Sequence, residues 1–526
     1  MAVTPDVSET VSQFREEMDT TVTGVTLGVL AVFVAVRFAF PNAMTKQVIP
    51  QVRGTMLDAF GWLFLTLMVL FVLFALFVIV GPWGSIRLGG PEAEPSYSYP
   101  AYLAMFFSAG IAAGIVFWAP AEALFHYGSP PPFVDAAASS PGAASGALQT
   151  VFFHWGISAW SAYVAVGLPI AYYAYNKGAP LRVSTLLRPF LGSDTADHPV
   201  AKLVDVLAVF ATIGGVATSV GFVGNQFLTG IEYQWDVATS NVDVFVIIAG
   251  LTVVFTVSVI TGVKRGIRRI AGVNVALFAV MALAVLLVGP TATIVTDGAL
   301  AMGTYLLEFV TMSFGPLLGA GGGGWFDTWT LFYWVWWFSW APFAGLFLAS
   351  ISRGRTLRTV TATGVLASAL ATVVWFAIIS TTSLHLQTSG AADILGAVGQ
   401  EGYAVAAFPM FEALPGGGLL VFLFFALIVT WIVTSADTST LTVAILGTKP
   451  GVAPETGSRI FWGVLQGAFG FGLIVVGGGN ALQSAAVITG GPFGVIALIG
   501  VVGLIWTVYD TEAAGEGIPG VESGDD

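Results

Sequence analysis

Residues 331–343 read LFYWVWWFSWAPF and place four tryptophans inside one apolar segment: Trp334, Trp336, Trp337 and Trp340. Lipid cannot satisfy an indole N–H, and tryptophans of membrane helices concentrate at the two interfaces rather than at mid-span. At about 100° per residue, Trp337 and Trp340 lie about 60° apart and share one helix face. Trp336 points elsewhere and is expected to pack. The segment therefore predicts a helix with an aromatic face at its middle.

The composition identifies an integral membrane protein. The 526 residues are 56% hydrophobic and only 9% charged, with a mean hydropathy of +0.86, whereas soluble domains are about 25% charged. The apolar runs are long and lack alternation, which favours helices over a barrel. The chain has no cysteine, which excludes disulfides and thiol chemistry. The polar N-terminus MAVTPDVSETVSQFREEMDT is not a cleaved signal peptide.

Acidic residues gather near the two ends of the chain. The net charge is −12 and the sequence pI is about 4.7, with EEMD near the start and YDTEAAGEGIPGVESGDD at the end. Carboxylates hold water and cations, so this pattern indicates a halophile. The alternative interpretation is a pair of disordered acidic tails.

A spanning helix needs about 20 mostly apolar residues, and this rule predicts twelve of them. The expected spans are 22–41, 58–82, 98–125, 148–176, 200–229, 243–262, 270–290, 326–350, 360–384, 418–446, 459–478 and 484–508. Two less apolar stretches, 294–318 and 391–413, are expected to lie at a surface. With both termini in the cytoplasm, only Arg37, Lys46 and Arg53 of the 18 basic residues fall on the outer side, as the positive-inside rule requires.

The chain also predicts an inverted repeat. Helix 98–125 has a small-residue middle, Ser108 to Gly114, followed by Pro120, and helix 326–350 has Pro342 after its tryptophans. Five helices start at each of these points, and an odd number per unit requires the second copy to be inverted. The predicted organisation is an acidic N-tail (1–20), two peripheral helices (21–90), a first repeat (91–293), a surface connector (294–325), a second repeat (326–508) and an acidic C-tail (509–526).

A second aromatic face lies on helix 148–176, where FHWGISAWSAY places Trp155, Trp160 and Tyr163 within an arc of about 140°. An interfacial belt or interior packing would also explain buried aromatics. A ligand site of indole faces would suit a quaternary ammonium ion, which has no N–H to donate. Such an aromatic box needs no acidic side chain as a counter-charge. This fits the predicted spans, in which Glu122 and Asp437 are the acidic residues that stand out.

Hydroxyl groups recur at corresponding places in the two repeats. ATIGGVATSVG contains Thr212, Thr218 and Ser219, and VTSADTSTLT contains Thr434 and Ser435. A hydroxyl in a helix commonly bonds back to the carbonyl one turn earlier. Beside an unwound helix, hydroxyls and freed backbone oxygens can instead form a cage for a small cation such as sodium.

Several of these segments together resemble the betaine/choline/carnitine transporters, over about residues 20 to 508. The most specific is WTLFYWVWWFSWAPFAGLFLASISRGRT (329–356). FHWGISAWSAYVAVGLPIAYYAYNKG, FWAPAEALFHYGSPP and TSADTST match in order. The resemblance implies an all-helical, multi-pass secondary transporter of the cell membrane, not an enzyme, with an inverted five-plus-five repeat. Members are often homotrimers, and no nucleic acid partner is expected.

The resemblance also implies specific site residues. The aromatic box would be Trp155, Trp160, Tyr163, Trp337 and Trp340, beside an unwound segment containing Gly110, Ala112 and Gly114. Sodium, the coupling ion and the only cofactor expected, would meet the hydroxyls of Thr434 and Ser435 and backbone oxygens near Ser108 and Ile111. A second sodium site would use Thr212 and Phe343, but the family's second threonine falls on Val216 here.

Two departures from the family pattern bear on function. Sodium-coupled betaine carriers commonly show Gly-x-Gly-x-Gly, whereas residues 110–114 read GIAAG. The extra methyl group of Ala112 tightens the approach of substrate to the backbone and bears on the choice among betaine, choline and carnitine. Some members sense osmotic stress with a long basic C-terminal tail, whereas the tail here is short and acidic, so that mode of regulation is not expected.

The leading hypothesis is sodium-coupled uptake of glycine betaine, or a near relative, by alternating access. The alternatives are proton-coupled choline uptake, carnitine-type substrate exchange, and an osmotically gated channel or sensor, although no polar stripe for a pore runs through the helices. A membrane enzyme is least favoured because the four histidines show no metal-ligand spacing: His126, His154, His198 and His385.

Overall fold

The computed structural model describes residues 7–110, 112–261, 263–315, 317 and 323–513. These residues form helices joined by turns and no β-strand; the only ladder contacts among them are two isolated bridges, Met18 to Thr448 and Arg87 to Thr356. The prediction of an all-helical membrane protein is confirmed. Ten helices in the described part of the chain are long and apolar enough to cross a membrane, so the predicted number of twelve is not established.

The first half of the chain contains most of the predicted spans, several of them divided. Its main helices are α2 (Thr20–Ala39), α4 (Ile49–Val80), α5 (Tyr99–Gly110), α6 (Ala112–Trp118), α7 (Glu122–Gly128), α8 (Pro141–Trp155), α9 (Ile157–Lys177), α11 (Pro199–Trp235), α12 (Asn241–Thr261) and α13 (Val263–Val288). Within the predicted span 98–125, α5 and α6 are separated only by Ile111, which lies outside the described residues, whereas a turn around Pro120 separates α6 from α7. The expected interruption at Pro120 is therefore observed, since proline disfavours a continuous helix.

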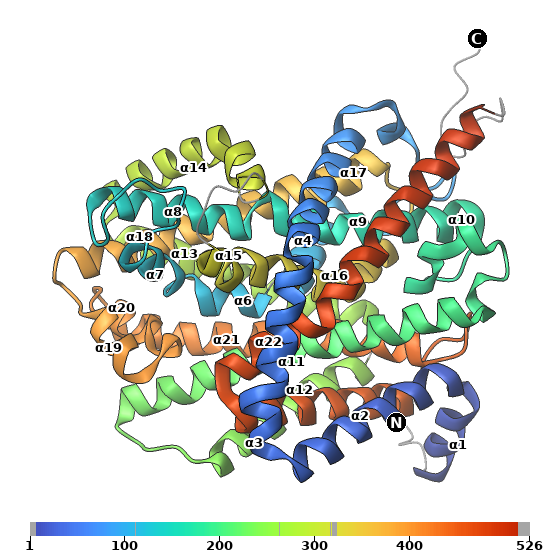
Figure 1. Ribbon diagram of the computed structural model, residues 1–526, viewed down its shortest axis with the longest axis horizontal. Helices are drawn as coiled ribbons and strands as arrows, with labels where there is room; N and C mark the ends of the chain where they lie inside the picture. The colour runs from blue at the N-terminus through green and yellow to red at the C-terminus, as the bar shows by residue number, and fades with distance from the viewer. Residues whose placement is uncertain (1–6, 111, 262, 316, 318–322, 514–526) are drawn as a thin grey trace.

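The second half follows the predicted order with one correction. Its helices are α14 (Thr291–Phe314), α15 (Gly323–Thr328), α16 (Thr330–Ile351), α17 (Leu357–Thr361), α18 (Ser368–Thr388), α19 (Ile394–Glu401), α20 (Ala407–Glu412), α21 (Gly417–Gly447) and α22 (Thr456–Ala513). The two last predicted spans are one continuous helix, α22, of 58 residues. In Figure 1 the red ribbon of α22 changes direction along its length, and this one helix contains both predicted spans.

A glycine sets the break between α8 and α9. A Cβ at Gly156 would lie 2.4 Å from the Phe152 carbonyl oxygen and 2.7 Å from the Tyr305 hydroxyl. The space is filled by that hydroxyl, which accepts a hydrogen bond from the Ile157 N–H at 3.1 Å. Tyr305 belongs to α14, so the surface helix supports the first turn of α9 and thereby holds Trp155 and Trp160 on two separate helices.

Burial separates an inner set of helices from an outer set. In α8–α9 and in α15–α16, 94% of the most apolar 18-residue window is buried, and in α11 the share is 89%, against 22% for α2 and 28% for α12. α16 packs against α9, α11 and α22, and α4 crosses in front of this group beside α22 (Figure 1). The tryptophan-rich helix is therefore at the centre of the molecule.

The start of the chain is helical rather than a simple tail. α1 (Val7–Glu17) is followed by Asp19, whose carboxylate accepts from the N–H groups of Thr21 and Val22 and caps α2. Backbone hydrogen bonds tie this corner to the α21–α22 loop, from Asp19 N–H to Gly447 O at 2.9 Å and from Lys449 N–H to Glu17 O at 2.8 Å. The predicted N-tail is thus docked on the helical body from residue 7 onward.

Candidate functional site

The predicted aromatic residues all lie in the interior. Trp155, Trp160, Tyr163 and Trp337 are 0% exposed and Trp340 is 1% exposed. An interfacial belt would leave such rings at the surface, and rings at the segment ends, such as Trp329 and Trp83, are only partly buried. Burial leaves interior packing and a ligand site as the two explanations.

One aromatic cluster joins the end of α8 to α16. The ring of Trp155 lies 4.9 Å from that of Trp337 and 5.3 Å from that of Tyr333, in edge-to-face contacts. Trp336 stacks on Trp337 at 5.1 Å and meets the edge of Trp340 at 6.3 Å. Trp336 therefore links the predicted pair, and the expectation that it points away from them is wrong. Helix periodicity alone could not reveal this, because long side chains bend toward neighbouring rings.

A second aromatic group lies on α9. The ring of Trp160 is 5.8 Å from that of Tyr163 and stacks at 5.9 Å on Phe107 of α5. No ring contact joins Trp160 to Trp337 or Trp340 among the described residues. The structure therefore brings the five predicted aromatics into two neighbouring groups rather than one closed ring.

Two glycines near the adjoining ends of α5 and α6 let both groups approach the backbone of these helices. A Cβ at Gly110 would lie 2.6 Å from the Trp160 ring, and one at Gly114 would lie 2.9 Å from Trp155 and 3.1 Å from Trp336. Only hydrogen fits at these distances. Ile111 lies outside the described residues, and the side chain of Ala112 is not described. The predicted glycine segment is thus adjacent to both aromatic groups.

Two buried donors near these rings have no partner among the described residues, namely Trp336 Nε1 and the Tyr163 hydroxyl. The other indoles donate to the protein: Trp337 to His154 O at 3.1 Å, Trp340 to Gly215 O at 3.2 Å and Trp160 to Thr372 Oγ1 at 3.2 Å. A buried polar group without a partner is costly. The two unpaired donors are therefore candidate contacts for a bound polar ligand.

A fully buried carboxylate lies directly behind the first cluster. Glu122 at the start of α7 accepts from Trp155 Nε1 and from the Tyr333 hydroxyl, both at 2.6 Å on Oε2. Its Oε1 lies 2.7 Å from His154 Nδ1 and 3.3 Å from His126 Nε2. We call Glu122, His126 and His154 the acid node. Sequence reasoning noted the acid and the histidines but did not connect them to the aromatic rings.

The acid node also bears on metal binding. One ligand atom from each of its three residues lies within 4.8 Å of the others, a grouping that spacing along the chain did not reveal. The carboxylate, however, is already engaged by donors on both oxygens, two of them N–H or O–H groups of cluster rings. The acid node therefore has the contacts of a hydrogen-bonded network centred on the Glu122 carboxylate.

The predicted sodium ligands on α21 lie against α13. Ser435 is 2% exposed and its hydroxyl has no partner in the described part of the chain. The Thr434 hydroxyl donates to Thr430 O at 2.9 Å and accepts from the side-chain amide of Asn274. Asn274 Oδ1 is buried and unpaired within the described residues, and Ser108 donates to Ala271 O at 3.3 Å. Asn274 was missed because an isolated amide carries no pattern.

The second predicted sodium position is less complete. The Thr212 hydroxyl is buried and lacks a partner among described residues, and Phe343 packs on Trp340 at 5.0 Å. Val216 occupies the place where the family's second threonine was expected, and it is buried. Thr218 and Ser219 bond back to Gly214 O and Gly215 O one turn earlier, as expected of ordinary helix hydroxyls.

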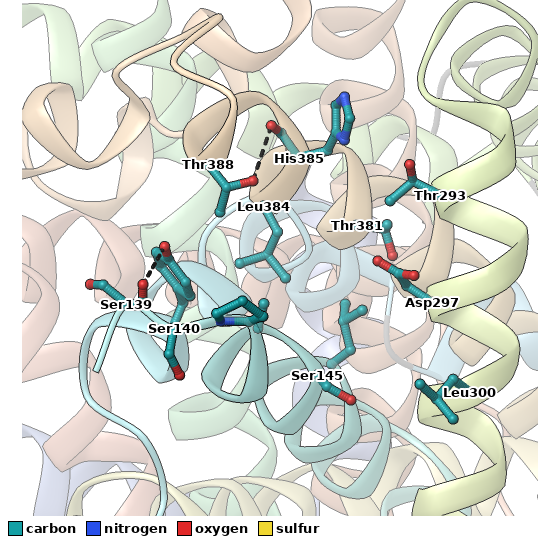
Figure 2. A pocket seen from close by; sticks show the side chains of 14 residues that line it. Ser139, Ser140, Ser145, Thr293, Asp297, Leu300, Thr381, Leu384, His385 and Thr388 are labelled. Carbon is teal, nitrogen blue, oxygen red and sulfur yellow. Dashed lines mark hydrogen bonds between the residues drawn. The ribbon is translucent and has the colours of Figure 1, made fainter. Parts of the chain in front are cut away.

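A separate cavity of about 590 Å³ opens between the start of α8, α14 and the end of α18 (Figure 2). Ser140, Asp297, Thr381 and His385 contribute polar atoms to its lining. The Thr388 hydroxyl, drawn in Figure 2, bonds to His385 O at 3.3 Å. None of the cluster aromatics lines this cavity, so it is distinct from the predicted site.

Comparison with known proteins places this arrangement among transporters. The family model for betaine/carnitine/choline transporters matches residues 21–513. A probable glycine betaine transporter of Desulfitobacterium hafniense is 34% identical over 92% of this chain and 96% of its own length. The glycine betaine transporter OpuD of Bacillus subtilis is 34% identical over 86% and 88%, respectively. An ectoine/hydroxyectoine transporter of Virgibacillus pantothenticus is 36% identical over 84% and 87%.

A solved structure supports the fold. The crystal structure of MhsT in complex with L-phenylalanine aligns with a TM-score of 0.50, over 82% of this chain and 94% of that one, at 14% identity. At that identity the likeness concerns the fold alone, a helical fold with inverted repeats. The predicted inverted repeat is therefore confirmed, whereas the residue boundaries of the repeats stay a prediction.

Proposed function

Because this chain belongs to the betaine/carnitine/choline transporter family, we propose that it takes up glycine betaine, or a related trimethylammonium osmolyte, by sodium-coupled alternating access. Family membership makes it a multi-pass membrane transporter and not an enzyme. We also propose the identity of the substrate, sodium as the coupling ion and a cytoplasmic location for both termini. The relatives in Desulfitobacterium and Bacillus carry the name glycine betaine transporter.

The observation that carries the proposal is the buried group of Trp155, Trp336 and Trp337 against Gly114 of α6. Indole faces attract a quaternary ammonium through their ring quadrupoles without needing an N–H on the ligand. The Trp336 N–H and the Tyr163 O–H, which have no partner among the described residues, supply donors suited to a carboxylate. Glycine betaine combines these two chemistries in one molecule.

Sodium coupling is supported by the buried Ser435 hydroxyl, which has no partner in the described part of the chain. α21, which carries it, packs against both α5 and α6. An ion held between α21 and these two helices would favour the same arrangement that presents Gly110 and Gly114 to the aromatic rings. Substrate and ion would then each raise the affinity for the other, as coupling through one conformation requires.

Uptake of labelled glycine betaine into proteoliposomes tests the proposal. Uptake is expected to be saturable and to need an inward sodium gradient; equal rates with and without that gradient would reject sodium coupling. Trp337→Ala should abolish high-affinity uptake. Trp462→Ala is the matched control, because Trp462 of α22 is equally buried and its only ring contact among the described residues is with Phe461, so its loss creates a similar cavity away from the cluster.

Two alternatives remain within the same assay. Ectoine is favoured as a second substrate by the 36% identical ectoine/hydroxyectoine transporter, and its competition against labelled betaine measures this directly. Proton-coupled choline uptake, or exchange of carnitine-type substrates, would appear as flux driven by a pH gradient or by internal substrate without sodium.

A further inference from the structure

A buried acid next to the aromatic cluster needs an explanation. Glu122 is 0% exposed, and removing an ionised carboxylate from water costs several kcal/mol unless other groups compensate. Among the described residues no lysine or arginine forms an ion pair with it; its partners are His126 and His154. The charge state of these two histidines therefore decides the charge of the acid node.

Hydrogen-bond partners indicate that both histidines are neutral. His154 Nε2 lies 3.0 Å from the Thr330 hydroxyl, and no other acceptor for that hydroxyl is found in the described part of the chain, so Thr330 donates to Nε2. The remaining proton of His154 then lies on Nδ1, toward Glu122. His126 Nδ1 is buried without a partner among the described residues, which suits a lone pair better than a charged N–H.

With two neutral histidines, the acid node carries one negative charge. Short contacts of 2.6 Å from Trp155 and Tyr333 to Oε2 are typical of charge-assisted hydrogen bonds. The indole N–H can only donate, so Oε2 serves as an acceptor. Two rings of the cluster that packs against Gly114 of α6 are thus fixed to one buried anion.

We propose that Glu122 is the counter-charge of the aromatic cluster, acting through Trp155 and Tyr333 as a positioning residue that sets the preference for a cationic over an uncharged trimethyl group. This inference rests on the proposed function. A carboxylate at the N–H edge of an indole holds the ring in one orientation and enriches the electron density of its face. Its charge also attracts a cation on the far side of the ring.

Coulomb's law gives the expected size of the effect. A cation on the Trp155 face lies about 8 Å from the carboxylate, and at an effective dielectric of about 20 the attraction corresponds to roughly 30-fold in affinity. The attraction between the cation and the ring faces also depends on ligand charge, but the rings remain in a variant of Glu122, so only the contribution of the carboxylate is lost there. The charge-dependent part can therefore be isolated with a ligand pair that differs in charge only.

Glycine betaine and 3,3-dimethylbutanoate form such a pair, because the second has carbon in place of the ammonium nitrogen and keeps the carboxylate. Binding of both is measured by calorimetry on the purified full chain and on Glu122→Gln, which keeps the size of the side chain. The dissociation constant of betaine should rise roughly 30-fold and that of the carbon analogue less than about threefold. Thr330→Val, which removes a bond to His154 but no charge, should leave the ratio between the ligands unchanged.

Equal losses for both ligands in Glu122→Gln, or no loss for either, would overturn the inference and leave the proposed function intact. Failure of the wild-type chain to bind betaine would remove the proposed function itself. If Glu122→Gln does not fold, infrared difference spectra of the wild type, recorded with and without betaine, provide the test. Binding of betaine should shift the frequency of a carboxylate band of the protein. A protonated-carboxyl band assigned to the buried acid would contradict the proposal.

Discussion

The close approach of Gly114 to two rings of the aromatic cluster offers a direct test of the site. Gly114 lies in α6 with an ordinary helical backbone, and a Cβ there would lie 2.9 Å from Trp155, 3.1 Å from Trp336 and 3.2 Å from a second atom of Trp155. Gly114→Ala is compatible with the helix and even favours it by about 1 kcal/mol. The unfavourable free energy of Gly114→Ala therefore comes from the contacts of the new methyl group with the indoles of Trp155 and Trp336.

The displacement follows from these distances. Non-bonded carbon atoms prefer about 3.5–4.0 Å, so the rings must move by about 0.5–1 Å. The Trp155 indole cannot move freely, because its N–H is fixed to Glu122 at 2.6 Å and its ring meets that of Trp337 in an edge-to-face contact at 4.9 Å. Overpacking of this kind costs about 1–3 kcal/mol, which corresponds to a loss of roughly 5- to 150-fold in betaine affinity if the cost is paid in the bound state.

The assay is calorimetric titration of betaine into the purified chain, with the thermal unfolding midpoint of each variant recorded in the same buffer. Gly28→Ala in α2 is the matched control, because nothing lies within 4 Å of a Cβ at that position. It should leave affinity unchanged. If Gly114→Ala bound betaine as tightly as the wild type at an unchanged midpoint, the edges of Trp155 and Trp336 would not form part of the site.

Three further outcomes are expected. Ser435→Ala should raise the sodium concentration for half-maximal uptake more than about tenfold, a loss of about 1.4 kcal/mol, whereas Ser219→Ala, which removes only a bond to Gly215 O, should not. Arg182→Met should lower the thermal midpoint sharply, because it leaves Asp205 buried without its partner at 3.0 Å at a cost of about 3–5 kcal/mol. Adding Asp205→Leu should recover part of that loss, and a further drop would contradict the reasoning. Phe14→Ala removes the ring of α1 that packs on Phe461 of α22 at 5.2 Å, so it should release α1 and increase protease cleavage near the N-terminus, with transport rates in intact protein as the control.

The sequence predicted the class and most of the helices because lipid imposes a simple rule: a span must be long and apolar. The rule is less informative where a helix is interrupted or continues past one span. Residues 98–125 contain enough apolar character for one span, yet a turn around Pro120 separates α6 from α7. Length alone predicted two spans at 459–478 and 484–508, but the backbone is helical throughout α22.

The candidate site was predicted in its residue types more than in its contacts. Aromatic faces on two segments indicated buried rings, and burial of Trp155 and Trp337 agrees with that expectation. Periodicity could not place Trp336, because its ring leans across onto Trp337. Nor could it find Asn274, which reaches Thr434 from another helix. Such contacts depend on tertiary packing between segments far apart in the chain.

The position of Glu122 changes the expectation that an indole box needs no acid. A carboxylate about 4 Å from a bound cation would attract it by about 4 kcal/mol at an effective dielectric of about 20, but the attraction falls to about 2 kcal/mol at about 8 Å. A transporter must release its ligand on each cycle, so direct ion pairing would slow the step that follows binding. An acid one ring behind the ligand favours the cation while the indole keeps the two charges apart. The short bonds from Glu122 to Trp155 and Tyr333 therefore fit a site that must distinguish a cation from its uncharged analogue and still let it go.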